Sequence, residues 1–136
     1  MKAALIFGLI LVTTTLQGCG EKKPEPLAAV EVTDYQASGT EPFWSITIKD
    51  KVISYDSPDD STDFSVPLTK IMPMQTGWEA RGFDDTKNIA LTVTKGKECS
   101  DGMSDRTYSD TVTARVALIG NVEGCGGEVT GGSEAP

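Results

Sequence analysis

Apolar and polar side chains alternate along the middle of this chain, and no long segment repeats its apolar residues at the 3.6-residue period of a helix. A period of two places every second side chain on the same face of a β-strand. In "FWSITIK", Trp44, Ile46 and Ile48 share one face, and Ser45 and Thr47 share the other. The same pattern predicts further strands within residues 52–57, 63–70, 77–83, 89–95 and 111–120.

Turn-forming segments separate these strands, and a hairpin turn is predicted at Lys49–Lys51. About seven short strands at this spacing predict an all-β fold, a small antiparallel meander closed or nearly closed as a barrel. Closure would also remove exposed sheet edges. A sandwich of about six or seven strands is the alternative.

Two segments of the predicted domain are less regular. A weak strand is expected from Val30 to Tyr35. The polar piece from Gly96 to Ser109 is expected to be a long loop that crosses the fold and is joined through Cys99 to the last strand.

Residues 1–18 predict a secretory signal peptide that is not part of the fold. Lys2 precedes an apolar run, Ala3 to Val12, which is too short to span a membrane. The end of this segment, "LQGC", resembles the lipobox of bacterial lipoproteins, in which a small residue precedes the cysteine that becomes lipidated. We therefore expect Cys19 to carry acyl chains such as palmitate. An ordinary signal peptide, with Cys19 incidental, is the alternative.

Several acyl chains would give a lasting membrane anchor, because each buried methylene contributes about 0.8 kcal/mol. Gly20, rather than an aspartate, follows the cysteine, which favours the outer membrane facing the periplasm. In a Gram-positive host the protein would lie on the outer face of the cell membrane. Residues 19–29 are expected to form a flexible tether, residues 30–125 a single β domain, and residues 126–136 a disordered tail.

Cys99 and Cys125 remain once Cys19 is lipidated, and an even pair in an oxidising compartment predicts a disulfide. Such a bond would stabilise a small domain by roughly 3–4 kcal/mol. Two free thiols or a metal pair are the alternatives.

Charge and composition restrict the class of function. Without the signal peptide the chain carries 11 basic and 20 acidic side chains, a net charge of −9. This charge argues against nucleic acid and anionic lipid headgroups as partners, and favours cationic partners or metal ions, unless it serves solubility alone. Histidine is absent, which excludes Ser-His-Asp and Cys-His catalysis. We expect a non-enzymatic protein without a cofactor.

The segment "SGTEPFWS" places Phe43 and Trp44 on opposite faces of a strand. One aromatic ring can fill the core while the other covers the mouth or the outside of the fold. The pair is either a strand start with a core tryptophan or a stacking platform for a sugar or a peptide.

The segment "CSDGMSDRTYSD" is polar and favours a turn at Asp101. Ser104 and Asp105 can cap that turn, and Arg106 has Asp101, Asp105 and Asp110 within reach. Tyr108 begins the next strand. These residues are either scaffolding or a ligand site. Asp101 and Asp105 could in principle act as an acid–base pair, but no other residues complete a catalytic set with them.

The acidic segment 56–63 could in principle bind Ca²⁺. It lacks the glycine and the final glutamate of an EF-hand loop, and we interpret it as a solvated turn. We predict no metal site.

Three motifs, "GTEPFW", "CSDGMSDRTY" and a final "GC", resemble a family of small, uncharacterised bacterial envelope proteins, often predicted lipoproteins. The resemblance covers residues 38–125. It implies envelope localisation but no established activity. The resemblance also implies an association, since the domain of this family sometimes accompanies modules of the envelope-stress and lysozyme-inhibitor kind.

Two hypotheses follow. The first is a periplasm-facing binding or structural lipoprotein that presents Phe43, Trp44, Asp101, Ser104, Asp105, Arg106 and Tyr108 to a partner. The second is an inhibitor of a cationic envelope hydrolase such as lysozyme. A hydrolase that uses carboxylates alone is a weaker third.

Overall fold

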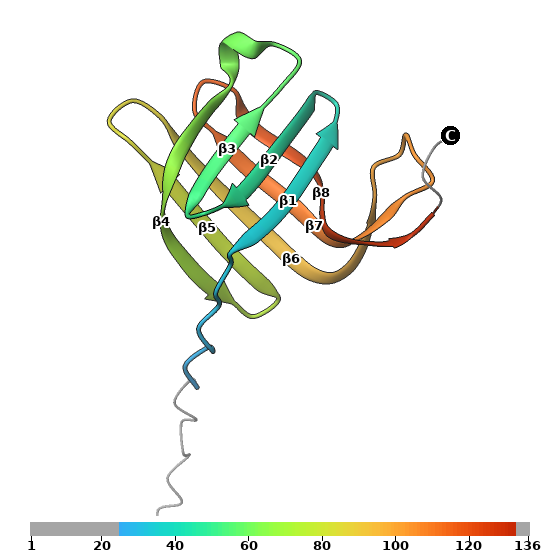
Figure 1. Cartoon of the computed structure of the whole chain (residues 1–136). Coiled ribbons are helices and arrows are strands. Elements are labelled where there is room, and N and C mark those ends of the chain that lie inside the picture. The colour runs from blue at the N-terminus through green and yellow to red at the C-terminus, as the bar shows by residue number, and fades with distance from the viewer. Residues whose placement is uncertain (1–24, 133–136) are drawn as a thin grey trace, which may run out of the picture.

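A computed structural model describes residues 25–132, which contain eight antiparallel β-strands and one short 3₁₀ helix (Figure 1). The strands are β1 (Asp34–Thr40), β2 (Phe43–Lys49), β3 (Val52–Asp56), β4 (Phe64–Met74), β5 (Gly77–Phe83), β6 (Asn88–Ser100), β7 (Thr107–Val116) and β8 (Gly120–Gly131). The helix η1 (Asp60–Thr62) lies between β3 and β4.

The sheet closes on itself as a barrel, because each strand pairs with its neighbours in sequence and β1 pairs with β8. This confirms the predicted antiparallel meander and excludes the sandwich. The closing ladder is short, however. Ala37 lies opposite Gly126 and Ser38 lies opposite Cys125, whereas β1 and β2 pair over all seven residues of β1.

Most of the barrel core consists of residues that the alternation predicts to face inward. Ala37 and Val122 lie outside the predicted strands, and the strand predicted over 111–120 is wrong after Val116, where Leu118 is exposed in the turn. Each core residue is 4% exposed or less, and burying a large apolar side chain contributes about 1.5–3 kcal/mol. The core residues of the first five strands are Ala37, Trp44, Ile46, Ile48, Ile53, Tyr55, Val66, Trp78 and Ala80. Those of the last three are Ile89, Leu91, Val93, Val112, Ala114, Val116 and Val122.

The predicted hairpin turn between β2 and β3 is confirmed. Lys49 pairs with Val52, and the two residues between them, Asp50 and Lys51, have φ angles of 50° and 63°. Positive φ at both central residues is the signature of a type I′ turn, whose twist matches that of the adjoining strands.

The N-terminal boundary of the sheet differs from the expected one. β1 begins at Asp34, so the predicted strand from Val30 is wrong for residues 30–33. Val30 and Val32 instead pack, partly buried, against the core. Their hydrophobicity is therefore satisfied by packing rather than by strand pairing.

The predicted long loop from Gly96 to Ser109 is also wrong. β6 continues to Ser100 and β7 begins at Thr107, so only residues 101–106 form the connection. The ends of β6, β7 and β8 extend past the barrel as an arm, which we define as residues 97–109 and 127–131 (Figure 1). The side chains of the arm are exposed or half-buried, so its sequence shows no apolar alternation. Its strands are nevertheless paired through their backbones.

The expected disordered tail is wrong for residues 126–131, which belong to β8 and pair with β7. Glycine and glutamate obscure this strand in the sequence, but pairs such as Val129 with Tyr108 hold it in the sheet. Residues 133–136 lie outside the described part of the chain.

The predicted disulfide between Cys99 and Cys125 is confirmed, with a Cα–Cα distance of 5.5 Å. It joins the end of β6 to β8, the strands on the two sides of β7. The bond therefore fixes the base of the arm to the barrel.

Within residues 25–132 the structure has no helix with the length and apolar character needed to cross a membrane. The predicted signal peptide and the lipidation site, Cys19, lie outside these residues.

Candidate functional site

Asp110 is the buried charged side chain in the described part of the chain, with 4% of its surface exposed. It occupies the first inward position of β7, followed at the same face by Val112, Ala114 and Val116. A carboxylate in an apolar setting requires compensating partners, because leaving water is costly for a charge. Asp110 therefore marks a polar site at one end of an apolar barrel.

Tyr35 is the hydrogen-bond donor to this carboxylate. Its hydroxyl group donates to Asp110 Oδ2 over 3.1 Å, and its ring packs edge-on against Trp78 with the ring centroids 4.9 Å apart. Burial, together with the charge of Asp110 and the hydrogen bond, raises the pKa of Tyr35 well above its ordinary value. The hydroxyl group therefore remains protonated, and remains a donor, across the physiological pH range.

Two glycines of β8 make room for this pair. A Cβ atom on Gly126 would lie 2.5 Å from the Tyr35 hydroxyl oxygen, and one on Gly127 would lie 2.6 Å from Asp110 Oδ2. Gly127 also has a φ angle of 78°, where the β7–β8 register shifts between Tyr108 and Asp110. Glycine is the residue that tolerates this bulge conformation.

A groove of about 800 Å³ lies between the start of β1 and the arm. We call it the seam groove, because it lies beside the ladder that closes the barrel. It is lined by Asp34, Tyr35 and Gln36 of β1, Lys95, Gly96 and Glu98 of β6, Tyr108, Ser109 and Asp110 of β7, and Gly127, Glu128 and Thr130 of β8.

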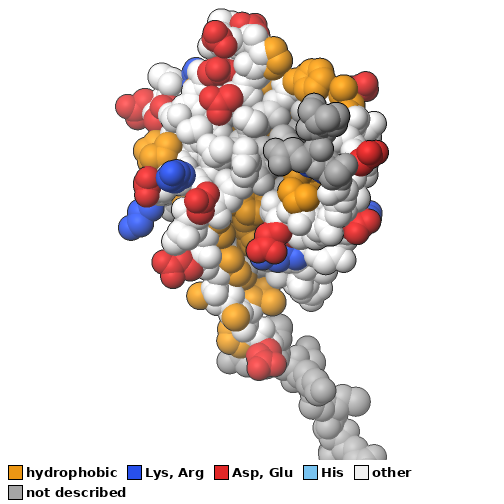
Figure 2. Space-filling model, turned by 45° about the vertical axis from the view of Figure 1, so that its right-hand side comes forward, with side chains coloured by type: hydrophobic (Ala, Val, Ile, Leu, Met, Phe, Trp, Pro, Cys, Tyr) orange, Lys and Arg blue, Asp and Glu red, His pale blue; other side chains and the backbone are white. Residues whose placement is uncertain are grey.

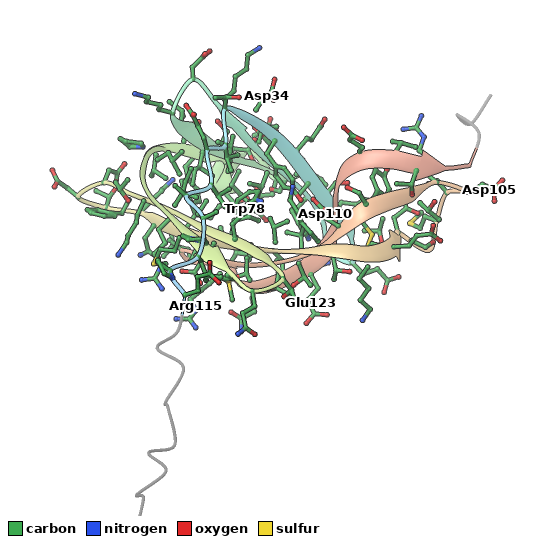
Figure 3. All side chains as sticks on the ribbon, turned by 90° about the horizontal axis from the view of Figure 1, so that it is seen from below. Asp34, Trp78, Asp105, Asp110, Arg115 and Glu123 are labelled. Carbon is green, nitrogen blue, oxygen red and sulfur yellow. A yellow bond between two sulfur atoms is a disulfide. The ribbon has the colours of Figure 1, made fainter. Side chains whose placement is uncertain are left out.

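The seam groove is acidic. Its lining contains four acidic side chains and one basic side chain, namely Asp34, Glu98, Asp110, Glu128 and Lys95. Figure 3 shows Asp110 between the barrel, where Trp78 is labelled, and the arm. On the face drawn in Figure 2, acidic side chains likewise outnumber basic ones. The groove therefore favours a positively charged occupant.

The predicted residues of the arm loop mainly stabilise the loop itself. Asp101 accepts hydrogen bonds from the backbone N–H groups of Met103 and Ser104 and from the Ser104 hydroxyl group. These hydrogen bonds, and secondarily the charge of Arg106, lower the pKa of Asp101. Thr40 adds a hydrogen bond to the Asp101 carbonyl oxygen. Asp105 is exposed in the same loop, which lies at the far end of the arm (Figure 3).

Phe43 and Trp44 lie on opposite faces of β2, as predicted, with 52% and 3% of their surfaces exposed. Trp44 fills the core against Gly39 and Gly124. Its Nε1 atom is the buried side-chain polar atom that has no hydrogen-bond partner among residues 25–132. A stacking platform that uses Trp44 is therefore wrong, because the ring is inaccessible, and only Phe43 is exposed.

Of the seven predicted binding residues, only Tyr108 lines the seam groove. Sequence reasoning considered Asp110 only as a partner of Arg106 and overlooked Tyr35. A signal for Asp110 did exist, since an aspartate occupies an inward position of the alternation that continues through Val112.

The acidic segment between β3 and β4 forms a capped turn. Asp59 accepts a hydrogen bond from the Ser61 N–H group at the start of η1, and Asp63 accepts one from the Ser57 N–H group. The part of the chain that the structure describes contains no cluster of three or more His, Cys, Asp or Glu side chains arranged to hold a metal ion.

No protein-family model, curated protein or solved structure matches this chain. The class of protein is therefore defined by the fold and the groove alone. The protein is a small, disulfide-linked, eight-stranded antiparallel barrel with an acidic groove beside its closing seam.

Proposed function

We propose that this protein is a non-enzymatic binding module of the cell envelope, which receives a positively charged group of a partner in the seam groove. The observation that carries the proposal is the buried Asp110 carboxylate in the lining of an acidic groove. A buried charge is most strongly stabilised by an opposite charge that also hydrogen-bonds to it.

The local contacts of Asp110 do not supply this opposite charge, so we assign it to a partner. Tyr35 supplies a neutral hydroxyl donor rather than a cation. Lys95 lies opposite Asp110 in the β6–β7 ladder, yet the ion pair found among the described residues joins Arg81 to Glu79, not Lys95 to Asp110. A guanidinium or ammonium group entering the groove would provide the missing charge.

Long-range electrostatics act in the same direction. The whole chain has a net charge of −8, which would steer cationic partners toward it and repel polyanions. Such steering is weakened by salt, whereas a contact with a buried carboxylate is screened much less.

The envelope location is supported by the predicted signal peptide, by Cys19 in its lipobox context and by the family resemblance. The disulfide is compatible with an oxidising compartment such as the periplasm. The same module would then be anchored to the outer membrane by the acyl chains on Cys19.

A binding role without catalysis is supported by the chemistry of the available side chains. The chain has no histidine, and Asp101 is engaged by its own turn. The buried carboxylate, Asp110, is paired with a tyrosine whose raised pKa makes it a poor acid or base near neutral pH.

The test locates the binding of a minimal cation. N-acetylarginine N-methylamide, which carries one guanidinium group and no other charge, is titrated into the ¹⁵N-labelled full chain in detergent micelles. Saturable shifts at the amides of Tyr35, Asp110 and Glu128 support the proposal. Shifts spread over the exposed carboxylates of the barrel, or their persistence in an Asp110→Asn variant, contradict it.

Inhibition of an envelope hydrolase such as lysozyme is the second candidate. The observation that favours it is the arm loop, which is internally capped and presents Met103 with 66% of its surface exposed. Inhibition that survives moderate salt but is lost in a Met103→Asp variant would support insertion of this loop into a cleft. Inhibition that disappears in moderate salt would indicate nonspecific attraction.

A further inference from the structure

The seam between β1 and β8 is only partly closed. The two strands contain seven and twelve residues but pair at Ala37 with Gly126 and at Ser38 with Cys125. On one side of this ladder, beyond Ala37 and Gly126, the start of β1 and the end of β8 each pair with one neighbour only, β2 and β7 respectively. Each of them therefore presents an unpaired backbone edge.

The bulge at Gly127 explains why the seam opens. Before it, Gly126 lies opposite Ala37 of β1 and Asp110 of β7, and beyond it the β7–β8 register has shifted. From that point β8 follows the arm away from β1, and the two strands diverge in Figure 1. The arm is kept in this direction by the disulfide at its base.

The two unpaired edges form opposite walls of the seam groove. Residues 34–36 of β1 line one wall, and Gly127, Glu128 and Thr130 of β8 line the other. Unpaired strand edges are templates for a further strand, and many proteins recognise extended peptides by adding them to such an edge. Here an added strand would meet an edge on both of its sides.

The charges of the groove define the strand that it would accept. Asp34 belongs to the β1 edge and Glu128 to the β8 edge, and Asp110 of β7 lines the same groove. Another copy of this acidic chain would be repelled, whereas a segment with lysine or arginine would be attracted. In an extended segment, alternate side chains point to the same side. Basic residues at every second position would therefore share the side that faces the groove, where one of them could reach the Asp110 carboxylate.

We propose that the seam groove binds an extended, basic peptide segment of a partner protein as an added strand between β1 and β8. The inference rests on the proposed function of the groove as a site for a positive charge, and adds backbone recognition to it. Three or four residues of the segment, about 10–13 Å in length, would run alongside the two edges. Their backbone groups would hydrogen-bond to the edges while a basic side chain reaches Asp110.

The test uses two peptides of identical charge on the full chain in detergent micelles. One is a short peptide with lysine at every second position and threonine between. The other has the same sequence with alternate backbone nitrogens methylated, so that it cannot donate hydrogen bonds to one of the edges. We expect the methylated peptide to bind at least about tenfold more weakly, through the loss of several hydrogen bonds. We also expect slower amide exchange at residues 34–36 and 127–130 with the unmethylated peptide.

Matched variants place the peptide in the groove. Glu128→Lys should weaken binding of the unmethylated peptide, whereas Glu123→Lys, on the same strand but outside the groove, should change it much less. Equal weakening by both variants would mean that only net charge matters, and would overturn the inference.

Other outcomes separate this inference from the proposed function. Equal binding of the two peptides, lost in Asp110→Asn, would overturn strand addition and leave the cation site in place. Binding of N-acetylarginine N-methylamide without binding of either peptide would do the same. Failure of all three probes would overturn both. Binding of the peptide only by a chain ending at Gly132 would show that the last four residues compete for the groove, and would overturn the inference for the intact protein.

Discussion

The hydroxyl group of Tyr35 donates a hydrogen bond to Asp110 Oδ2 across 75 residues of sequence. Barrel closure makes this contact possible, because it places β1, the first strand, beside β8, which in turn pairs with β7, the strand of Asp110. The pair joins the apolar core, through the ring contact of Tyr35 with Trp78, to the acidic seam groove. Fold stability and the proposed binding of a cation would therefore depend on the same two side chains.

Removing the tyrosine hydroxyl group should destabilise the fold. Tyr35→Phe leaves a buried carboxylate without its donor, and we expect the free energy of unfolding to fall by about 1–3 kcal/mol in urea denaturation. Tyr108→Phe removes a hydroxyl group from the same groove and should change the free energy by less than about 0.5 kcal/mol. Equal effects of the two variants would refute a special role for the Tyr35–Asp110 hydrogen bond.

The raised pKa of Tyr35 predicts a loss of stability at alkaline pH. In the unfolded chain this tyrosine ionises near its ordinary pKa of about 10, whereas in the fold it keeps its proton. Above that pH the unfolded state binds fewer protons, so the free energy of unfolding falls with rising pH, by up to about 1.4 kcal/mol per unit from this group. Urea denaturation between about pH 9 and 11 should show a shallower decline for Tyr35→Phe than for the native chain. Parallel curves would contradict the assignment.

The disulfide should contribute a large share of the stability. It closes a loop across a sequence separation of 26, and its removal by a Cys99→Ala/Cys125→Ala double substitution should cost roughly 3–4 kcal/mol. The arm should lose more protection from amide exchange than the barrel core, because the bond fixes its base. Uniform loss of protection across both would show that the arm has no independent mobility.

The close approach of Gly127 to Asp110 can be tested against a glycine in open space. Gly127 and Gly102 have similar φ angles, 78° and 74°, but a Cβ atom at Gly102 has no neighbour within 4 Å. Gly102→Ala should cost about 1 kcal/mol from backbone strain alone. Gly127→Ala should cost clearly more and should also weaken cation binding. Equal costs would mean that Asp110 and Ser109 move aside freely.

The barrel could be predicted because its strands bury one face only. Apolar alternation through Ile46, Leu91 and Val112 reports burial directly, and the turn residues between the strands set their order. The disulfide followed from an even number of remaining cysteines. These features depend on local patterns and on counts.

The arm and the seam groove could not be predicted in the same way. The arm is held by backbone pairing with few buried side chains, so its strands leave no periodic signal. The Tyr35–Asp110 contact depends on barrel closure and on a bulge at Gly127, which no local pattern specifies. The polar composition of the arm loop is compatible with a ligand site, but its polar groups largely form hydrogen bonds with one another.

The most direct test of the central claim is a calorimetric titration of the full chain with N-acetylarginine N-methylamide, in parallel with Asp110→Asn and Asp105→Asn. Both variants remove one negative charge, from the buried groove residue and from the exposed arm loop respectively. The proposal predicts that Asp110→Asn weakens binding by about tenfold or more while Asp105→Asn changes it little. Equal affinities of the native chain and Asp110→Asn would contradict it.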